Sequence, residues 1–292
     1  MVETYEFRIF EDYYHLLPKP NNAKFNGACY VLKIPKENFL YEEIDKIDKK
    51  VRKKHGESFF GFWYIKRQYS KNELIEAELL NLKIKTTFEP TGEDCGTVYD
   101  ETVVCEICGS NRKQVSPLVL KKGSIPKKDI ARTIGSEVIV SSKLVNAVKR
   151  RNLKGFIFSP IYFTKGTSDY YQLSASNEIE LSSKTITGIN PFNFSKGSEE
   201  FTSKVWGYEV KYEKEVYVCP NGDLIGLNQI SEAYVLNNEL IGKFDFLASR
   251  QKIGVKRGFL VPEPLYFCSQ AFRQMVIEEK LSGFEFEVAH IV

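Results

Sequence analysis

The sequence feature that most constrains the fold is a block of residues that occurs twice. Residues 140–158 read VSSKLVNAVKRRNLKGFIF, residues 268–286 read CSQAFRQMVIEEKLSGFEF, and the two segments align without a gap. Each has a serine that can cap a helix, an apolar helical face, a glycine where a helix can end, and a strand-like run. The matched pairs are Ser141 and Ser269, Leu144 and Phe272, Val148 and Val276, Leu153 and Leu281, Gly155 and Gly283, Phe156 and Phe284, and Phe158 and Phe286. Two such copies would pack as a pseudo-symmetric pair.

Shorter matches extend the repeat upstream in both copies. Residues 118–120 align with 234–236, and Asp129-Ile130 aligns with Asp245-Phe246. An insertion at 252–264 separates the blocks of the second copy. The alternative is that two ordinary strand–helix–strand units resemble each other by chance. Because the order of several blocks agrees as well as their contents, the pattern favours a repeat.

The first ninety or so residues lie outside the repeat and predict a small α+β unit. Alternation predicts strands at 5–10 and 29–34, an aromatic strand at 58–67 and a further strand at 80–88. Residues 39–55 have an apolar helical face, and Ser70 and Glu73 have the spacing of a capping box. Turn-forming residues at 89–92 mark a boundary. We therefore expect an α+β fold with mostly antiparallel sheets and three parts, at 1–92, 93–204 and 205–292.

The segments between the repeated blocks are less regular. We expect a short strand at 117–120, a short helix that begins at Ser124 and carries Asp129 and Ile130, and an extended segment at 138–140. Residues 164–204 are rich in Ser, Thr, Asn and Gly, which predicts irregular hairpins and loops. Residues 205–218 are typical of strands.

Composition narrows the class of protein. The 292 residues carry a net charge of +3, which is too small to indicate a nucleic-acid partner by itself. No apolar run of about 18 residues is present, so we expect no membrane span, and the N-terminal residues lack the pattern of a signal peptide. The expected location is the cytoplasm, where thiols are reduced, and a close cysteine pair there indicates a metal site rather than a disulfide.

The cysteines predict at most one structural zinc ion. Cys105 and Cys108 form a C-x-x-C-G half-site, which needs two further ligands. The repeat places Cys219 opposite Cys105, so Cys219 is the expected third ligand, and Cys95 is the expected fourth by its nearness in sequence. The motif around Cys219 lacks a second cysteine, so the alternative is a site that has decayed and binds nothing. We expect Cys29 and Cys268 to be buried apolar thiols.

A catalytic metal is not expected. Catalytic zinc keeps an open coordination position beside an acid or base. The only histidines are His15, His55 and His290, and none stands in an H-x-E or H-E-x-x-H pattern. The sequence also has no Walker loop, no G-x-G-x-x-G and no G-x-S-x-G element. We therefore expect a protein that is not an enzyme.

With these motifs in view, the chain resembles bacterial immunity-type proteins of the double-CxxCG class, which are encoded beside polymorphic toxins. The resemblance rests on the C-x-x-C-G motif, the Asp-Ile pair and the S-x-x-L…L-x-G-F-x-F block. It covers about residues 95–163 and, more weakly, 217–288, where the second motif is reduced to Cys219-Pro-Asn-Gly222. The resemblance implies a cytoplasmic, non-catalytic protein that binds and neutralises a cognate toxin.

Stoichiometric neutralisation needs aromatic anchors within a polar rim. The aromatic strand offers Phe60, Phe62 and Tyr64, which alternation places on one face, and the alternative is that a second layer covers both faces. The basic run at 49–54 is expected to be a solvated helix face, and the alternative is a nucleic-acid-binding patch. The basic run at 149–154 is expected to place favourable charge at a helix C-terminus, and the alternative is phosphate binding. The alternative function is a zinc-ribbon-like nucleic-acid-binding or regulatory protein. The sequence does not predict an oligomeric state.

Overall fold

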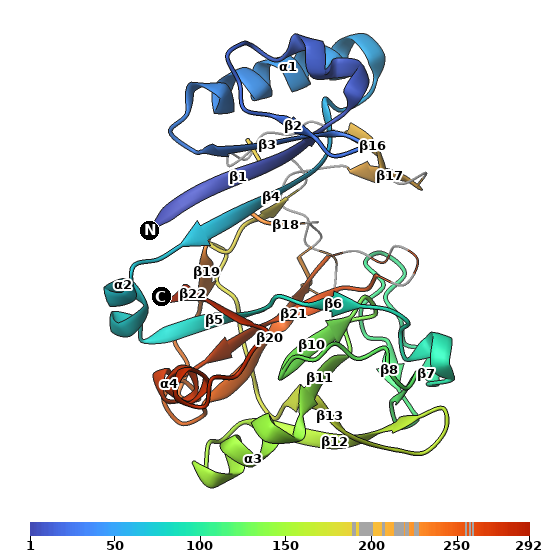
Figure 1. Cartoon of the computed structure of the whole chain (residues 1–292), viewed down its shortest axis with the longest axis vertical. Coiled ribbons are helices and arrows are strands. Elements are labelled where there is room, and N and C mark those ends of the chain that lie inside the picture. The colour runs from blue at the N-terminus through green and yellow to red at the C-terminus, as the bar shows by residue number, and fades with distance from the viewer. Residues whose placement is uncertain are drawn as a thin grey trace.

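The protein has an N-terminal unit and two six-stranded sheets that lie beside each other (Figure 1). The structure is a computed structural model. It describes residues 1–188, 191–192, 201–205, 208–212, 219, 222–224, 228–254, 256, 258 and 260–292, and at 201–205, 208–212 and 228 it describes the backbone alone. The sheets are mostly antiparallel and the helices few and short, so the expected α+β class is confirmed.

The N-terminal unit is a four-stranded sheet covered by one long helix. The strand order is β2-β3-β1-β4, with β1 (Val2–Ile9), β2 (Lys24–Phe25), β3 (Tyr30–Pro35) and β4 (Phe60–Gln68). Helix α1 (Phe39–His55) packs its predicted apolar face on this sheet and ends at Gly56 in the left-handed conformation. A 3-10 turn, η1 (Glu11–Leu16), joins β1 to β2. Helix α2 (Lys71–Glu76) follows β4 and has the predicted capping box of Ser70 and Glu73.

The first six-stranded sheet, here called the first-half sheet, has the order β6-β10-β11-β13-β12-β9. Its strands are β6 (Thr87–Phe88), β9 (Val119–Leu120), β10 (Ile130–Thr133), β11 (Val138–Ser141), β12 (Phe156–Phe163) and β13 (Thr167–Ala175). Helix α3 (Ser142–Arg150) joins β11 to β12. The 3-10 turn η2 (Glu93–Cys95) and the small ladder of β7 (Tyr99–Asp100) and β8 (Lys113–Gln114) come between β6 and β9.

The second-half sheet has the order β14-β20-β21-β5-β22-β19. Its strands are β5 (Leu79–Ile84), β14 (Glu178–Ile179), β19 (Ala233–Val235), β20 (Phe246–Ile253), β21 (Glu263–Cys268) and β22 (Phe284–Ile291). Helix α4 (Gln270–Glu278) joins β21 to β22. Two further ladders pair β15 (Thr187–Gly188) with β18 (Asn228–Gln229), and β16 (Phe201–Val205) with β17 (Tyr208–Tyr212).

The two sheets have the same strand order and the same strand directions. In each, the two edge strands are parallel to their neighbours and the remaining pairs are antiparallel. The predicted matching segments both fold as helix, turn and strand. The longer β20–β21 hairpin contains the insertion at 252–264. The position of β13 in the first-half sheet is occupied in the second by β5, which comes from the other end of the chain.

The same hydrogen bonds recur in the two halves. Asp129 Oδ1 accepts from the hydroxyl of Ser141 (2.9 Å), and Asp245 Oδ1 accepts from that of Ser269 (2.7 Å). Ser141 caps α3 by accepting from the backbone of Leu144, and Ser269 caps α4 in the same way. Each aspartate therefore holds the residue that begins its helix.

Each aspartate also binds the other half. Asp129 Oδ2 accepts from the backbone N–H of Ser282 (2.8 Å), and Asp245 Oδ2 accepts from that of Lys154 (2.8 Å). Ser282 O and Lys154 O in turn accept from the backbone N–H groups of Asp129 and Asp245. These reciprocal contacts place the two halves around a pseudo-two-fold axis.

Gly155 and Gly283 lie at this crossing. Their φ angles are +102° and +101°, and neither ends the helix before it. A Cβ on Gly155 would lie 2.1 Å from Phe246 O, and one on Gly283 would lie 2.2 Å from Ile130 O. The glycines are required by the close approach of the two backbones, a stricter reason than the expected helix end.

One apolar core joins the halves. The inner faces of α3 and α4 pack together with residues of both sheets, including Leu144, Val148, Phe272 and Val276. The basic end of α3 meets the acidic end of α4, where Arg151 lies 2.6 Å from Glu278 and Arg150 lies 3.0 Å from Glu279. The charges at 149–154 therefore belong partly to the contact between helices.

Three expectations about the fold were wrong or incomplete. No helix forms after Ser124, because Ile130 begins strand β10, which pairs with both β6 and β11 in the first-half sheet. Residues 164–204, expected to form irregular hairpins and loops, include the long strand β13, which pairs with β11 and β12 although its sequence is polar. The N-terminal unit ends before the predicted boundary at 92, since β5 and β6 already pair with the repeat. Of the region 205–218, residues 206–207 and 213–218 lie outside the described residues. No helix in the described part of the chain is long and apolar enough to span a membrane.

Candidate metal centre and partner-binding surfaces

Each half supplies one tight turn that carries a cysteine. In the first, Cys105 N–H donates to Ser110 O (2.8 Å) and Gly109 N–H donates to Cys105 O (2.8 Å). In the second, Cys219 N–H donates to Asp223 O (2.9 Å) and Gly222 N–H donates to Cys219 O (2.8 Å). Both glycines have positive φ, +78° and +88°. The second turn is one residue shorter, so Cys108 has no counterpart in it.

Three thiols meet where the turns come together. The Sγ atoms of Cys105, Cys108 and Cys219 lie within 4.8 Å of one another. Cys108 and Cys219 are buried and Cys105 is half-buried. The thiols are free rather than paired in a disulfide. This cluster could bind a metal ion, with ligands from two segments that are far apart in the sequence.

The turn geometry also sets the acidity of the thiols. The backbone N–H of Cys108 lowers the pKa of Cys105, since it donates to the sulfur. Burial raises the pKa of Cys108 to about 12. A bound cation reverses the effect of burial, because a coordinating thiol is deprotonated.

The structure leaves Cys95 apart from the cluster. Cys95 lies at the end of η2, where the backbone of Lys121 reaches its thiol. The expected fourth ligand is therefore not among the three thiols that the fold brings together. Cys268 is buried as expected, whereas Cys29 is only half-buried. His290 binds Glu232 instead of the cluster (2.9 Å).

A carboxylate lies beside the thiols. Asp223 Oδ2 is 3.6 Å from Cys108 Sγ and 4.0 Å from Cys219 Sγ. The hydroxyl of Ser110 donates to the same oxygen, and the backbone N–H of Lys252 donates to Oδ1 (2.8 Å). Asp223 was not among the predicted site residues, although its place one residue after Gly222 is the signal that could have found it.

The aromatic strand β4 does not alternate along its whole length. Arg8 pairs with Phe62 but Ile9 pairs with Phe60, so Gly61 is an extra residue in β4. This bulge turns Phe60 into the core, where it is 4 % exposed, together with Phe59 and Trp63. The expectation that Phe60 contacts a partner was therefore wrong.

Phe62 and Tyr64 lie on the opposite face of β4. Phe62 is 38 % exposed, and the guanidinium of Arg8 stacks over its ring at 4.8 Å from the centroid. The two rings are 6.1 Å apart, and the hydroxyl of Tyr64 donates to Glu6 (3.0 Å). Glu6 also pairs with Lys33 at 2.8 Å. The outer face of this sheet thus combines two aromatic rings with fixed charges.

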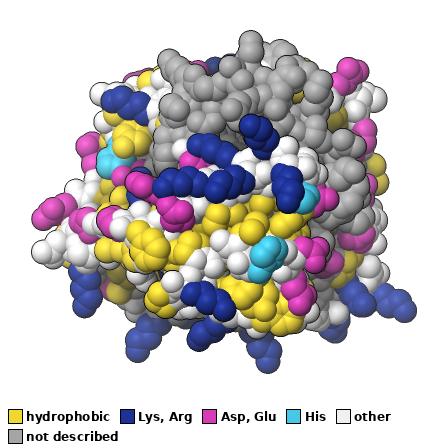
Figure 2. Space-filling model, turned by 90° about the horizontal axis from the view of Figure 1, so that it is seen from above, with side chains coloured by type: hydrophobic (Ala, Val, Ile, Leu, Met, Phe, Trp, Pro, Cys, Tyr) yellow, Lys and Arg dark blue, Asp and Glu magenta, His cyan; other side chains and the backbone are white. Residues whose placement is uncertain are grey.

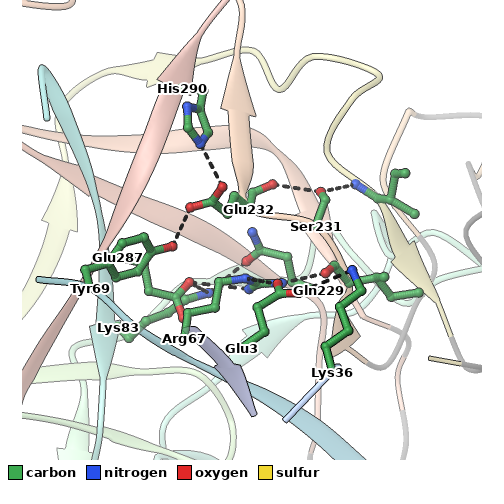
Figure 3. A network of polar contacts seen from close by, with 12 residues as sticks. Glu3, Lys36, Arg67, Tyr69, Lys83, Gln229, Ser231, Glu232, Glu287 and His290 are labelled. Atoms are coloured by element: carbon green, nitrogen blue, oxygen red, sulfur yellow. Dashed lines mark hydrogen bonds and ion pairs between the residues drawn. The ribbon is translucent and has the colours of Figure 1, made fainter. Parts of the chain in front are cut away.

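A polar network joins the N-terminal unit to the second half (Figure 3). Arg67, which is 4 % exposed, pairs with Glu3 (3.0 Å) and lies 3.7 Å from Glu287. Its guanidinium also donates to the backbone oxygen of Ile230. Lys83 lies at the same distance from Glu287 and donates to Gln229 (2.8 Å).

Beside it, Glu232 accepts from the hydroxyl of Tyr69 (2.6 Å) and contacts His290 (Figure 3). A pocket of about 410 Å³ opens along this network, and its lining includes Tyr64 and Lys66 of β4, Glu285 of β22, and Lys85, which follows β5. The network residues lie in segments that are remote in the sequence, and no motif signals them.

The basic run of α1 forms the solvated face that was expected. Lys46 and Lys49 pair with Glu43 and Asp45 of the same helix. Asp48 is the exception, because it is fully buried and accepts from Arg52 (2.6 Å) and from the backbone of Phe59 (2.8 Å). Seen from the end of the molecule where α1 lies, Lys and Arg side chains form a row with acidic side chains beside it (Figure 2). Mixed charge of this kind is typical of a solvated face rather than a nucleic-acid interface.

Comparison of the chain with models of known protein families and with curated protein sequences finds no match.

Proposed function

We propose that this protein is a non-catalytic bacterial immunity-type protein that binds and neutralises a cognate toxin, and that a structural zinc ion fastens its two halves. The observation that supports the proposal best is the meeting of two cysteine turns, one from each half. The chain resembles the double-CxxCG class through one C-x-x-C-G motif, the Asp-Ile pair and the S-x-x-L…L-x-G-F-x-F block, and it departs from that class where the second motif is reduced to Cys219-Pro-Asn-Gly222. The meeting of Cys219 with Cys105 and Cys108 supports the view that this reduced motif is the counterpart of the first.

Zinc suits the donor set. Thiolates at 2.3 Å are its common structural ligands, and tetrahedral geometry separates two such sulfurs by about 3.8 Å. The Sγ atoms of Cys105, Cys108 and Cys219 are near enough for that geometry. The ligands come from both halves, so the ion would link segments more than a hundred residues apart and stabilise the native state only.

The metal part of the proposal is tested by elemental analysis of protein purified without added metal. We expect about one zinc ion per chain, and its loss in Cys108→Ser. Cys29→Ser is the matched control, because Cys29 lies in the N-terminal unit. A zinc content near zero in the wild-type protein overturns this part.

The outer face of β4 is the proposed toxin-binding surface. Phe62 and Tyr64 supply rigid aromatic area, and Arg8 and Lys33 supply a charged rim. Neutralisation then follows from covering the toxin or holding it inactive, with one immunity protein bound per toxin.

The functional part is tested with the product of the adjacent toxin gene. Co-expression should restore growth, and the purified pair should bind. Replacing Phe62 and Tyr64 by Ala should weaken binding by about 2 kcal/mol or more at a hot spot, which is roughly 30-fold in Kd. Phe25→Ala is the control, because Phe25 is an exposed aromatic on the far edge strand of the same sheet.

Two outcomes would contradict this proposal. If the wild-type protein does not protect cells from the toxin, immunity is overturned. If it protects equally well without Phe62 and Tyr64, the binding face lies elsewhere and only that assignment is lost.

A further inference from the structure

Aligning the two cysteine turns shows how the second one differs from the first. Gly222 follows Cys219 by three positions and Gly109 follows Cys105 by four, so the missing residue is the counterpart of Cys108. After each glycine, Ser110 and Asp223 accept the same backbone hydrogen bond from the first cysteine of their turn. Compared with the first turn, the second turn lacks one thiol and has a carboxylate, that of Asp223, in the position that Ser110 occupies in the first.

The carboxylate of Asp223 is buried, and the described part of the chain places no cationic side chain in an ion pair with it. Asp223 is 5 % exposed, and no Lys, Arg or His side chain among the described residues forms an ion pair with it. Its hydrogen bonds come from the hydroxyl of Ser110 and the backbone N–H of Lys252. A buried carboxylate is costly unless it is paired or binds a metal. Here its neighbours are thiols, which become negative on metal binding.

The distances fit a common ion. With Zn–S of 2.3 Å and Zn–O of 2.0–2.2 Å, tetrahedral geometry separates the sulfur and oxygen ligands by about 3.6 Å. Asp223 Oδ2 lies 3.6 Å from Cys108 Sγ and 4.0 Å from Cys219 Sγ. Asp223 does not belong to the group of ligand atoms that all lie within 4.8 Å of one another, so its side chain has to rotate toward Cys105 to complete the tetrahedron.

We propose that Asp223 is the fourth ligand and that the site is Cys₃Asp, with Cys105, Cys108 and Cys219 as the thiolates. This inference rests on the zinc part of the proposed function. It replaces Cys95, and it assigns Ser110 as a positioning residue, because the Ser110 hydroxyl orients the carboxylate. Second-shell partners of this kind orient metal ligands and tune affinity.

The first measurement uses the unmodified protein. X-ray absorption at the zinc edge of the wild-type chain should show three sulfur ligands and one oxygen ligand. Four sulfurs would overturn the Asp223 assignment and leave the zinc proposal intact. Absence of zinc from the wild-type protein would overturn both.

The second measurement separates the carboxylate from a water ligand. In the cobalt-substituted protein, added 2-mercaptoethanol should leave the wild-type spectrum unchanged, because Asp223 fills the fourth position. In Asp223→Ala the same thiol should bind and give a four-thiolate spectrum. Equal response of the two proteins would overturn the proposal.

Competition with a chelator gives the affinity. Asp223→Asn has the same shape and a weaker donor, and it should lose zinc at least about 10-fold more readily, since changing even an outer-shell partner of a metal ligand typically costs that much affinity. Cys95→Ser is the matched control and should compete like the wild-type protein. Equal zinc retention by Asp223→Asn, or loss in Cys95→Ser, would overturn the assignment.

Discussion

The first-half and second-half sheets share strand order, cross-half hydrogen bonds and helix caps, but only the first is built from continuous chain. In the first half, β13 follows β12 and lies between β11 and β12. In the second, the corresponding position between β21 and β22 is taken by β5. The strand at this position therefore follows the repeated segment of its own half in the first sheet, whereas in the second sheet it precedes both repeated segments in the sequence.

This displacement explains how the parts are connected. After β5 the chain passes to β6 at the edge of the first-half sheet, and after β13 it passes to β14 at the edge of the second-half sheet. Each sheet therefore has one edge strand, β6 or β14, that directly follows a central strand of the other sheet. Excising either half would expose unpaired strands, so we expect them to unfold together.

The strongest test of the comparison is the pair Gly155→Ala and Gly283→Ala. Each new Cβ meets a backbone oxygen of the other half within 2.2 Å, and each residue has φ near +100°. We expect each substitution to lower the free energy of unfolding by about 4 kcal/mol, with similar values in the two halves. Urea unfolding followed by circular dichroism measures it.

Gly166→Ala is the control for this pair. Its φ is +94°, but a Cβ there meets nothing within 4 Å, so only backbone strain of about 1–2 kcal/mol is expected. If Gly155→Ala costs no more than Gly166→Ala, the halves do not approach as closely as described.

The sequence predicted the parts of the fold that depend on local pattern. The apolar period located α1, α3 and α4, and Ser141 and Ser269 located the first turns of α3 and α4. The exchange of β5 was not predictable from those patterns, because residues 79–84 and 170–175 share little sequence beyond their place in a sheet. β13 was missed for a similar reason, because only Tyr171, Leu173 and Ala175 of this polar segment face the core that the halves share, and its pairing with strands on both sides depends on distant parts of the chain.

The candidate site was predicted in the same uneven way. The repeat alignment alone was enough to bring Cys219 to Cys105, because corresponding turns meet at a pseudo-two-fold axis. Nearness in sequence gave Cys95, which the fold leaves apart. The bulge at Gly61 removed Phe60 from the outer face, and strict alternation cannot show such a shift.

The next effect concerns the aspartates that cross between the halves. Asp129→Ala removes the acceptor of Ser141 and of the Ser282 N–H, and Asp245→Ala removes the acceptor of Ser269 and of the Lys154 N–H. We expect each to lower the free energy of unfolding by about 2 kcal/mol, because donors are left unpaired. Urea unfolding of the two variants beside the wild-type protein measures the loss.

Asp169→Ala is the control for the aspartate pair. Asp169 is exposed on β13, and its replacement should change stability by less than about 0.5 kcal/mol. Unequal effects of Asp129→Ala and Asp245→Ala would show that the two halves depend differently on the same contact.

A smaller effect depends on pH. Cys268 in the second half occupies the place of Val140 in the first, and burial raises the pKa of its thiol. The unfolded thiol ionises near its usual value of about 8.5 while the folded thiol stays protonated. The unfolded state thus binds fewer protons, and stability should fall as pH rises above about 8.5, by up to 1.4 kcal/mol per pH unit.

Cys268→Val makes the second half like the first and isolates this contribution. At pH 7 the variant should differ little from the wild-type protein, because both side chains are small and apolar. Between pH 9 and 10, in the presence of reductant, it should lose less stability than the wild-type protein. Parallel pH profiles would show that Cys268 does not contribute.

The smallest effect is expected where the helices meet at the surface. Arg151, the residue that follows α3, pairs with Glu278 of α4, and both side chains are partly exposed. Solvent and salt screen such pairs, whereas Leu144, Val148, Phe272 and Val276 pack beneath them in the shared core. We expect Arg151→Gln to lower the free energy of unfolding by less than about 1 kcal/mol, and the difference should vanish in 1 M salt, where the Debye length is about 3 Å. Lys243→Gln, which breaks an exposed pair with Glu239 away from the helices, is the control. A larger loss that persists at 1 M salt would mean that the charges, rather than the apolar faces, hold α3 against α4.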